Sequence, residues 1–285
     1  MIPLLDNYEL IVPGSLHDVV EAFVRYPHAR PFAGGTDLMV LLEAGHLPPG
    51  RYISLQNCRE LHGISDADDG GVRIGALTTY TDISRSARLT RDYPLLGSAA
   101  RETGGVATQN RGTIGGNIAN ASPAADTPPV LLVYDAELEL LSSTGLRRVP
   151  YVTFHRGYKK MDLAEGELIA RVILPKRTGG TAGDYFRKVG ARRAQAISKV
   201  CLAGTIRVEN GVVQDVRLAL GSVAPTVVRA MKTEDDLRGH ALDEHSIASA
   251  ERTLLTEIAP IDDIRSTARY RTRVAQNLLR EFLTR

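Results

Sequence analysis

The sequence predicts an α+β protein of two domains that meet near residue 176. A chain of 285 residues exceeds the common size of a single domain. Short strand-like runs alternate with helical patterns through its first part, and LPKRTGGTAGDY, which begins at Leu174, is its most linker-like stretch. We therefore expect a first domain over residues 1–176 and a second α+β domain over residues 177–285.

Three segments near the start predict a helix, a strand and a second helix. SLHDVVEAFVRYP opens with Ser15 as an N-cap, and apolar residues follow it at helical spacing. ARPFAGG predicts a short strand that ends in a glycine pair. TDLMVLLEAGH predicts a helix capped by Thr36 or Asp37 and ended by Gly45.

Further segments of the first domain repeat this mixture of strands and helices. VRIGALTTYTDIS, from Val72, predicts a strand, a turn and the start of a helix. YPLLGSAARETGG predicts a helix closed by Gly104 and Gly105. DTPPVLLVYDAELELLS, from Asp126, predicts a proline-initiated helix followed by a strand.

The second domain carries a hairpin signal and a closing helix. ENG at 209–211 lies between two alternating strands, a pattern typical of a β-hairpin. ARYRTRVAQNLLREFL places Val274, Leu278 and Leu279 on one side and arginines on the other. We expect those arginines to form a solvated helix face.

Composition excludes several classes of function. The chain has 35 basic and 33 acidic residues and no block of like charge, which argues against nucleic-acid binding. Cys58 and Cys201 stand alone, so neither a disulfide framework nor a protein-bound iron–sulfur cluster is supported. The N-terminus lacks a basic leader, and no apolar run is long enough for a membrane span. We expect a cytoplasmic protein.

Motifs that would indicate a catalytic residue are absent. The sequence contains no GxGxxG after a strand, no P-loop, no GxSxG and no HExxH. The seven histidines lack metal-ligand spacing, and we interpret His155 and His240 as surface or structural residues. We therefore predict neither a catalytic residue nor a metal site in this chain.

Two glycine pairs are the most informative feature, AGGTDL at 33–38 and TIGGNIANASPAAD at 113–126. Glycine at a strand-to-helix turn permits positive φ, so that successive backbone N–H groups can bind an anion beside a helix N-terminus. A lone pair is more often only a tight turn. Two similar turns with polar followers favour a ligand, and a diphosphate would use both. Candidate hydrogen-bonding groups are Thr36, Thr113, Asn117 and Ser122 for phosphate, and Asp37 and Asp126 for ribose or ribityl hydroxyls.

A basic cluster after the linker allows two interpretations. It comprises Lys188, Arg192, Arg193 and Lys199. These side chains could contact phosphates or a partner protein, or they could simply form a solvated face. The sequence alone leaves both open.

Five segments in fixed order carry a family resemblance: AGGTDLMV, IGALTTYTDI, TIGGNIANASPAADTPPVLLVYDAELEL, ELIARVILP and FRKVGARRAQAISKV. They resemble the FAD-binding subunit of molybdenum hydroxylases, a family that includes xanthine dehydrogenase, carbon monoxide dehydrogenase and 4-hydroxybenzoyl-CoA reductase. The resemblance spans nearly the whole chain, including GSVAPT and the closing arginine-rich helix. A cysteine-rich insertion that distinguishes the reductase branch is missing after the second glycine pair, which favours the hydroxylase branch.

The resemblance implies a flavoprotein fold of the vanillyl-alcohol-oxidase (PCMH) type. Two lobes, about 1–58 and 59–176, would hold FAD between them, and a C-terminal α+β domain would follow. The implied cofactor contacts at the diphosphate are Arg30, Pro31, Phe32, Ala33, Gly34, Gly35, Thr36, Asp37 and Leu38, with Thr113, Ile114, Gly115, Gly116 and Asn117. The resemblance adds Asp126, Ile169 and Lys188, whereas Thr103, like the loop around Ala194 and Gln195, stands where some relatives place an aromatic near the flavin.

The resemblance also implies an oxidoreductase assembled from several subunits. Electrons would arrive from 2Fe–2S clusters on a small partner, reduce FAD in this chain and leave to NAD or another acceptor. Substrate would react on a large molybdopterin-binding partner, and the assembly would be a dimer of heterotrimers. Two alternatives stay open, a self-contained FAD-dependent reductase or oxidase of the same fold and a regulatory nucleotide-binding module without redox activity.

Overall fold

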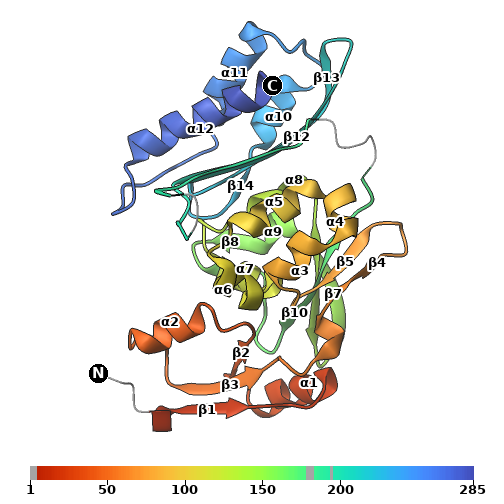
Figure 1. The fold of residues 1–285 in the computed structure, drawn as a ribbon, viewed down its shortest axis with the longest axis vertical. Helices are drawn as coiled ribbons and strands as arrows, with labels where there is room; N and C mark the ends of the chain where they lie inside the picture. The colour runs from red at the N-terminus through yellow and green to blue at the C-terminus, as the bar shows by residue number, and fades with distance from the viewer. Residues whose placement is uncertain (1–4, 178–182, 193–194) are drawn as a thin grey trace.

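The computed structural model describes residues 5–177, 183–192 and 195–285, and these form three consecutive blocks along the longest axis (Figure 1). We define them as the first block (5–61), the second block (62–177) and the third block (183–285). Each block has its own main sheet. The centre of the linker-like stretch, residues 178–182, lies outside the described residues.

The first block is a small parallel sheet with helical crossovers. The strand order is β1-β3-β2, and both strand pairs are parallel. The Ser15 hydroxyl accepts a hydrogen bond from the Asp18 N–H and caps the start of α1, as predicted. Val19 and Phe23 form the buried side of this helix. The elements are η1 (Leu5–Asn7), β1 (Tyr8–Ile11), α1 (Leu16–Arg25), β2 (Arg30–Phe32), α2 (Leu38–Glu43), β3 (Gly50–Ser54) and η2 (Arg59–Leu61).

The second block is an antiparallel five-stranded sheet, in the order β4-β5-β10-β6-β7, with helices packed against it. A separate hairpin joins β8 and β9. Its strands are β4 (Ile64–Asp66), β5 (Val72–Gly75), β6 (Glu137–Ser142), β7 (Gly145–Pro150), β8 (His155–Gly157), β9 (Lys160–Met161) and β10 (Leu168–Leu174). Its helices are α3 (Tyr80–Arg85), α4 (Ala87–Asp92), α5 (Pro94–Glu102), α6 (Val106–Arg111), α7 (Ile114–Asn120), α8 (Thr127–Val133) and α9 (Tyr151–Phe154).

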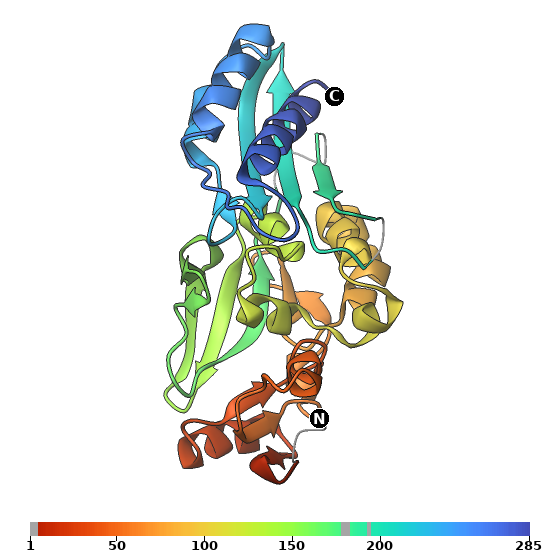
Figure 2. The same ribbon diagram turned by 90° about the vertical axis from the view of Figure 1, so that its left-hand side faces the viewer.

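The third block is an antiparallel four-stranded sheet, in the order β11-β12-β13-β14, with three helices on its outer face (Figure 2). The predicted hairpin is confirmed, since Asn210 and Gly211 link β12 and β13 with φ of 52° and 77°. Positive φ at both turn residues defines the type I′ geometry. The elements are β11 (Tyr185–Val189), β12 (Val200–Glu209), β13 (Val212–Gly221), β14 (Val228–Arg229), α10 (Met231–Leu237), α11 (Glu244–Leu254) and α12 (Ala268–Leu283).

The sheet of the third block is covered on both faces. Leu202 and Leu220, directly opposite each other, belong to the core beneath the C-terminal helices. Ala203 and Ala219, one residue further along and also opposite each other, belong to the core of the second block, where α8 packs against β12 and β13. Because side chains alternate across a strand, leucines fill one face and small alanines let α8 approach the other.

The expected arginine face of α12 is only partly correct. Arg269 and Arg273 are exposed as predicted, but Arg271 is 4% exposed. Arg271 stands four and seven positions before the buried Ala275 and Leu278, so it lies on the apolar stripe of the helix. Its guanidinium is hydrogen-bonded to the third block's own loops.

Candidate cofactor site

The first glycine pair forms an open loop between β2 and α2. Gly35 has φ of +76°, a conformation that glycine adopts without strain. The N–H groups of Gly34, Gly35, Thr36 and Asp37 find no acceptor among the described residues. Four consecutive unpaired donors beside a positive-φ glycine are the arrangement that binds an anion. This loop therefore fits the diphosphate of a dinucleotide.

The second glycine pair differs from the prediction. Gly115 and Gly116 do not form a positive-φ turn but lie in the first turn of α7, behind the N-cap Thr113. The Gly115 N–H donates to the Ala76 carbonyl at 2.9 Å, and the Gly116 N–H donates to the Thr113 hydroxyl at 3.1 Å. These donors are already used. Glycine is required at 115 because a Cβ there would lie 2.6 Å from the Ala76 Cβ.

The loop that carries the first glycine pair, in the first block, lies against the segment around the second glycine pair, in the second block; we call the two segments the first and second glycine loops. A Cβ on Gly34 would lie 1.9 Å from the carbonyl oxygen of Arg111, so only glycine permits this approach. The Asn120 side-chain amide donates to the Asp37 carboxylate at 3.2 Å. Asp37 occupies the N-cap position of α2, as predicted, but its side chain makes no capping hydrogen bond. It links the two loops instead.

A buried polar cluster lies where the second and third blocks meet. Lys188 Nζ donates to Asp126 Oδ2 at 2.6 Å and to the Glu102 carbonyl at 2.8 Å. Ser198 Oγ donates to Asp126 Oδ1 at 2.6 Å. The two charged side chains are 4% and 7% exposed. Burial raises the pKa of Asp126, and the facing Lys188 ammonium opposes that rise.

Of the two interpretations left open for the basic cluster, the solvated face does not hold for Lys188. Lys188 is buried in an ion pair. Lys199 lies over the Tyr270 ring, 5.4 Å from its centroid, and the exposed Arg192 donates to the Gln195 carbonyl. Arg193 lies outside the described residues. The three described residues, Lys188, Arg192 and Lys199, therefore do not form one solvated patch.

The remaining predicted contacts divide between the two places just described. Arg30, Pro31, Phe32, Ala33 and Leu38 lie on or beside the first glycine loop, and Thr113, Ile114 and Asn117 belong to the second. The side-chain amide oxygen of Asn117 accepts a hydrogen bond from the hydroxyl of Thr127, the neighbour of Asp126. Ser122 accepts from the Ala124 N–H, in the segment that leads to Asp126.

Two of the predicted cofactor contacts, Thr103 and Ile169, contact other residues of the chain. Thr103, which is half-buried, donates its Oγ1 hydroxyl to the Ala99 carbonyl at the end of α5. Ile169 is 6% exposed and belongs to the core of the second block, next to a β-bulge in β10. The loop position named with Thr103 is described only at Gln195, whose side chain packs against Gly105. Ala194 lies outside the described residues.

Sequence reasoning did not predict several residues that make hydrogen bonds at the glycine loops or around the buried polar cluster. Asn120, Ser198 and Ser222 are common polar residues with no motif of their own. Ser222 has φ of 64°, which no propensity argument predicts. Arg271 carried a usable signal, because its spacing placed it on the apolar side of its helix.

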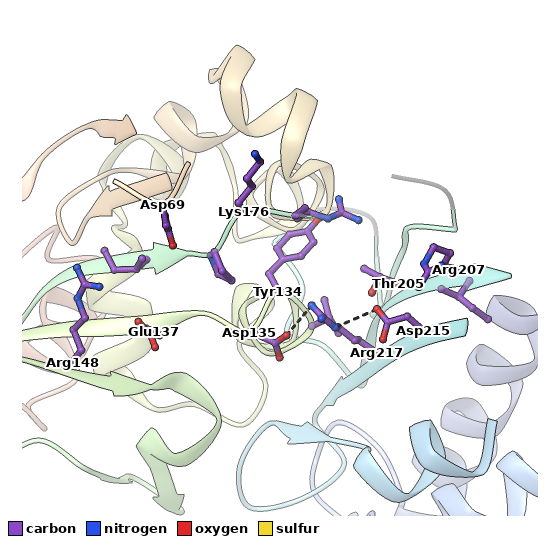
Figure 3. Close-up of a pocket in the computed structure, with 15 residues that line it drawn as sticks. Asp69, Tyr134, Asp135, Glu137, Arg148, Lys176, Thr205, Arg207, Asp215 and Arg217 are labelled. Atoms are coloured by element: carbon purple, nitrogen blue, oxygen red, sulfur yellow. Dashed lines mark ion pairs between the residues drawn. The ribbon is translucent and has the colours of Figure 1, made fainter. Parts of the chain in front are cut away.

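A pocket of 460 Å³ lies elsewhere, between the second and third blocks (Figure 3). None of the predicted site residues is among its lining residues. Arg217 at its centre is 2.7 Å from Asp135 and 3.6 Å from Asp215, so its charge is already balanced. This pocket does not mark the cofactor site.

Comparison with known families decides the identity of the chain. The model of the FAD binding domain in molybdopterin dehydrogenase matches residues 6–177, and that of the CO dehydrogenase flavoprotein C-terminal domain matches residues 185–285. The chain belongs to the FAD-binding subunits of the molybdenum hydroxylase family. The predicted family, the α+β flavoprotein fold and the oxidoreductase class are thereby confirmed.

Individual relatives cover almost the whole chain. The xanthine dehydrogenase FAD-binding subunit of Escherichia coli O157:H7 is 31% identical over 95% of this chain and 92% of its own length. The glyceraldehyde dehydrogenase medium chain of Sulfolobus acidocaldarius is 31% identical over 93% and 92%. A carbon monoxide dehydrogenase structure from Hydrogenophaga pseudoflava superposes with a TM-score of 0.90, at 28% identity over 96% of this chain and 95% of that chain.

The site's chemistry agrees with a flavin cofactor. FAD is the cofactor of this family's domain, and the unpaired N–H groups of Gly34–Asp37 suit its diphosphate. In the described part of the chain, His, Cys, Asp and Glu side chains form no group that could hold a metal ion. Within the same residues, every helix is too short or too polar to cross a membrane.

Proposed function

We propose that this chain is the electron-transferring flavin module of a multi-subunit molybdenum hydroxylase. Electrons enter from 2Fe–2S clusters on a small partner and leave to NAD or another acceptor. When bound, FAD supplies the redox chemistry, and the protein supplies its binding and orientation. The observation that carries the proposal is the row of N–H groups at Gly34–Asp37, beside the second block, that have no acceptor among the described residues.

The proposed cofactor contacts are those named from the sequence, with roles refined by the geometry. The first glycine loop holds the diphosphate through its backbone, while Thr113–Asn117 shapes the facing wall. Asp126 and Lys188 contact FAD together, as one buried ion pair. We also propose the domain division at 176 and 177, which the three separate sheets support.

The proposed assembly includes a large molybdopterin-binding subunit and a small 2Fe–2S subunit, arranged as a dimer of heterotrimers in the cytoplasm. Support comes from the names of the relatives, which are medium chains and FAD-binding subunits. Cys58 and Cys201 are both buried and separate, so clusters have to come from a partner.

Expression of the chain alone and with its neighbouring genes tests the function. The chain alone should bind one FAD, which acid precipitation should release because neither glycine loop contains a histidine or cysteine. Co-expression should give a complex that reduces this flavin when substrate is added. A colourless chain that does not take up FAD would contradict the proposal. A chain that oxidises a small substrate unaided would favour a self-contained flavoenzyme.

A further inference from the structure

Arg271, in the first turn of α12, holds together one end of the β12–β13 hairpin. Its Nη1 donates to the Lys199 carbonyl at 2.6 Å and to the Ser222 carbonyl at 3.1 Å. Its Nη2 donates to Asp263 at 2.8 Å. Lys199 directly precedes β12 and Ser222 directly follows β13, so both lie at the end opposite the hairpin turn. Figure 2 shows α12 lying along this sheet.

The same end of the hairpin contacts the segment that leads into α8. The Ser222 N–H donates to the Pro123 carbonyl at 2.7 Å, and Ser198 Oγ donates to Asp126 at 2.6 Å. The Ser222 hydroxyl also donates to the Ser198 carbonyl at 2.8 Å. Ser222 is held at φ of 64°, a conformation that persists in a non-glycine residue only when its surroundings impose it.

The arrangement demands arginine rather than any cation. One planar guanidinium bonds two carbonyls from different loops and a carboxylate. A lysine ammonium is a compact point charge on a flexible stem and does not reproduce this planar fork. At 4% exposure, Arg271 receives little help from water, so loss of any of these bonds leaves a buried polar group unpaired.

We propose that Arg271 is a positioning residue for the cofactor site. By fixing the open end of the hairpin, it places Ser198, which together with Lys188 orients the Asp126 carboxylate. The inference rests on the proposed function, in which Asp126 contacts FAD. A purely structural Arg271 would affect the melting temperature and leave the surroundings of the bound flavin unchanged.

The test compares two matched pairs of variants in the full chain reconstituted with FAD. Arg271→Lys is paired with Arg280→Lys, because Arg280 lies on the same helix and also binds carboxylates, Glu244 and Glu251. Ser198→Ala is paired with Ser249→Ala, because Ser249 also donates to an aspartate, Asp236, away from the hairpin end. The readouts are the Kd for FAD, the visible circular dichroism of the bound flavin and the melting temperature.

We expect Arg271→Lys and Ser198→Ala each to raise the Kd by about tenfold, the effect of losing a hydrogen bond to a charged group. Both should change the flavin dichroism, while the two controls should change neither. If Arg271→Lys does not fold, Asp263→Asn decides, because it keeps Arg271 and its two carbonyl partners and removes only the charge of the third partner. Wild-type Kd and dichroism in both variants would overturn the inference. Failure of the wild-type chain itself to bind FAD would instead overturn the proposed function.

Discussion

The two glycine pairs look alike in sequence, yet the protein uses their backbones differently. At Gly34 and Gly35 the chain leaves a strand, one glycine takes positive φ, and consecutive N–H groups have no acceptor among the described residues. At Gly115 and Gly116 the chain is helical, and both N–H groups are paired. The first pair supplies donors for a ligand. The second pair removes side chains so that α7 can pack closely against Ala76.

The contrast shows that a repeated motif need not repeat its function. Glycine serves either by allowing an unusual φ or by omitting a side chain, and the sequence does not distinguish the two. Substitutions at each position separate these roles, because a Cβ added at each glycine meets a different neighbour.

The largest effect should follow Gly34→Ala. The new Cβ would lie 1.9 Å from the Arg111 carbonyl oxygen, which is backbone and has no rotamer to change. We expect a destabilisation of roughly 1–3 kcal/mol, and an FAD Kd raised by about a hundredfold or more as the two loops separate. Gly71→Ala is the control, since its Cβ would meet the Leu174 carbonyl at 2.2 Å, away from the glycine loops. Titration of both apoproteins with FAD should show weak binding only for Gly34→Ala.

Amide hydrogen exchange shows directly which N–H groups of the two glycine loops are hydrogen-bonded within the protein. We expect the N–H groups of Gly34–Asp37 to exchange freely in the apoprotein, and FAD to slow them by roughly tenfold or more. The N–H of Gly115 should be protected with or without FAD, because it donates to Ala76 in the protein itself. Equal protection of both loops in the apoprotein would contradict the contrast.

Gly35→Ala should have an intermediate effect. Its φ of +76° costs a residue with a Cβ about 1–2 kcal/mol, and the neighbour at 2.9 Å is the tip of the Phe32 side chain and not a backbone atom. We expect the FAD Kd to rise by about tenfold. Gly45→Ala is the control: its φ is similar, +71°, and the added Cβ would have no neighbouring atom within 4 Å. It should lower the stability and leave the FAD Kd unchanged. Thermal melts and FAD titrations of both variants make this check.

Gly116→Ala should have the smallest effect. Gly116 is exposed and helical, and an added Cβ meets only the Thr113 hydroxyl, at 2.9 Å. Alanine is favoured over glycine in a helix by up to about 1 kcal/mol, which offsets a weakened cap. We therefore expect little change in melting temperature and a smaller loss of FAD affinity than for Gly35→Ala. The reverse order would show that the second loop, and not the first, makes the closer cofactor contact.

Local signals in the sequence predicted local structure well. Ser15 caps α1, Gly45 follows α2 with positive φ, and Asn210–Gly211 turns the hairpin. Each depends on the conformational preferences of a few neighbouring residues. The helix at Ile114–Asn120 was not predicted, because two glycines hide its pattern.

Contacts between distant segments could not be predicted from such signals. Lys188 follows a linker and stands among other basic residues, so its sequence context suggests solvent. The fold places it against Asp126, on another block, where burial makes pairing obligatory. The family resemblance named both residues as cofactor contacts, but it did not indicate that they bind each other.

The unpaired donors at Gly34–Asp37 also connect the stability of the protein to the supply of its cofactor. A ligand that binds only the folded state raises the free energy of unfolding, by about 2.7 kcal/mol when its free concentration is a hundred times Kd. Because the loop also faces the second block at Arg111, a bound diphosphate would hold two parts of the chain together. When FAD is scarce, we therefore expect the first block to open before the rest and to become the first target of proteolysis. The amount of intact subunit in a cell would then follow its flavin supply.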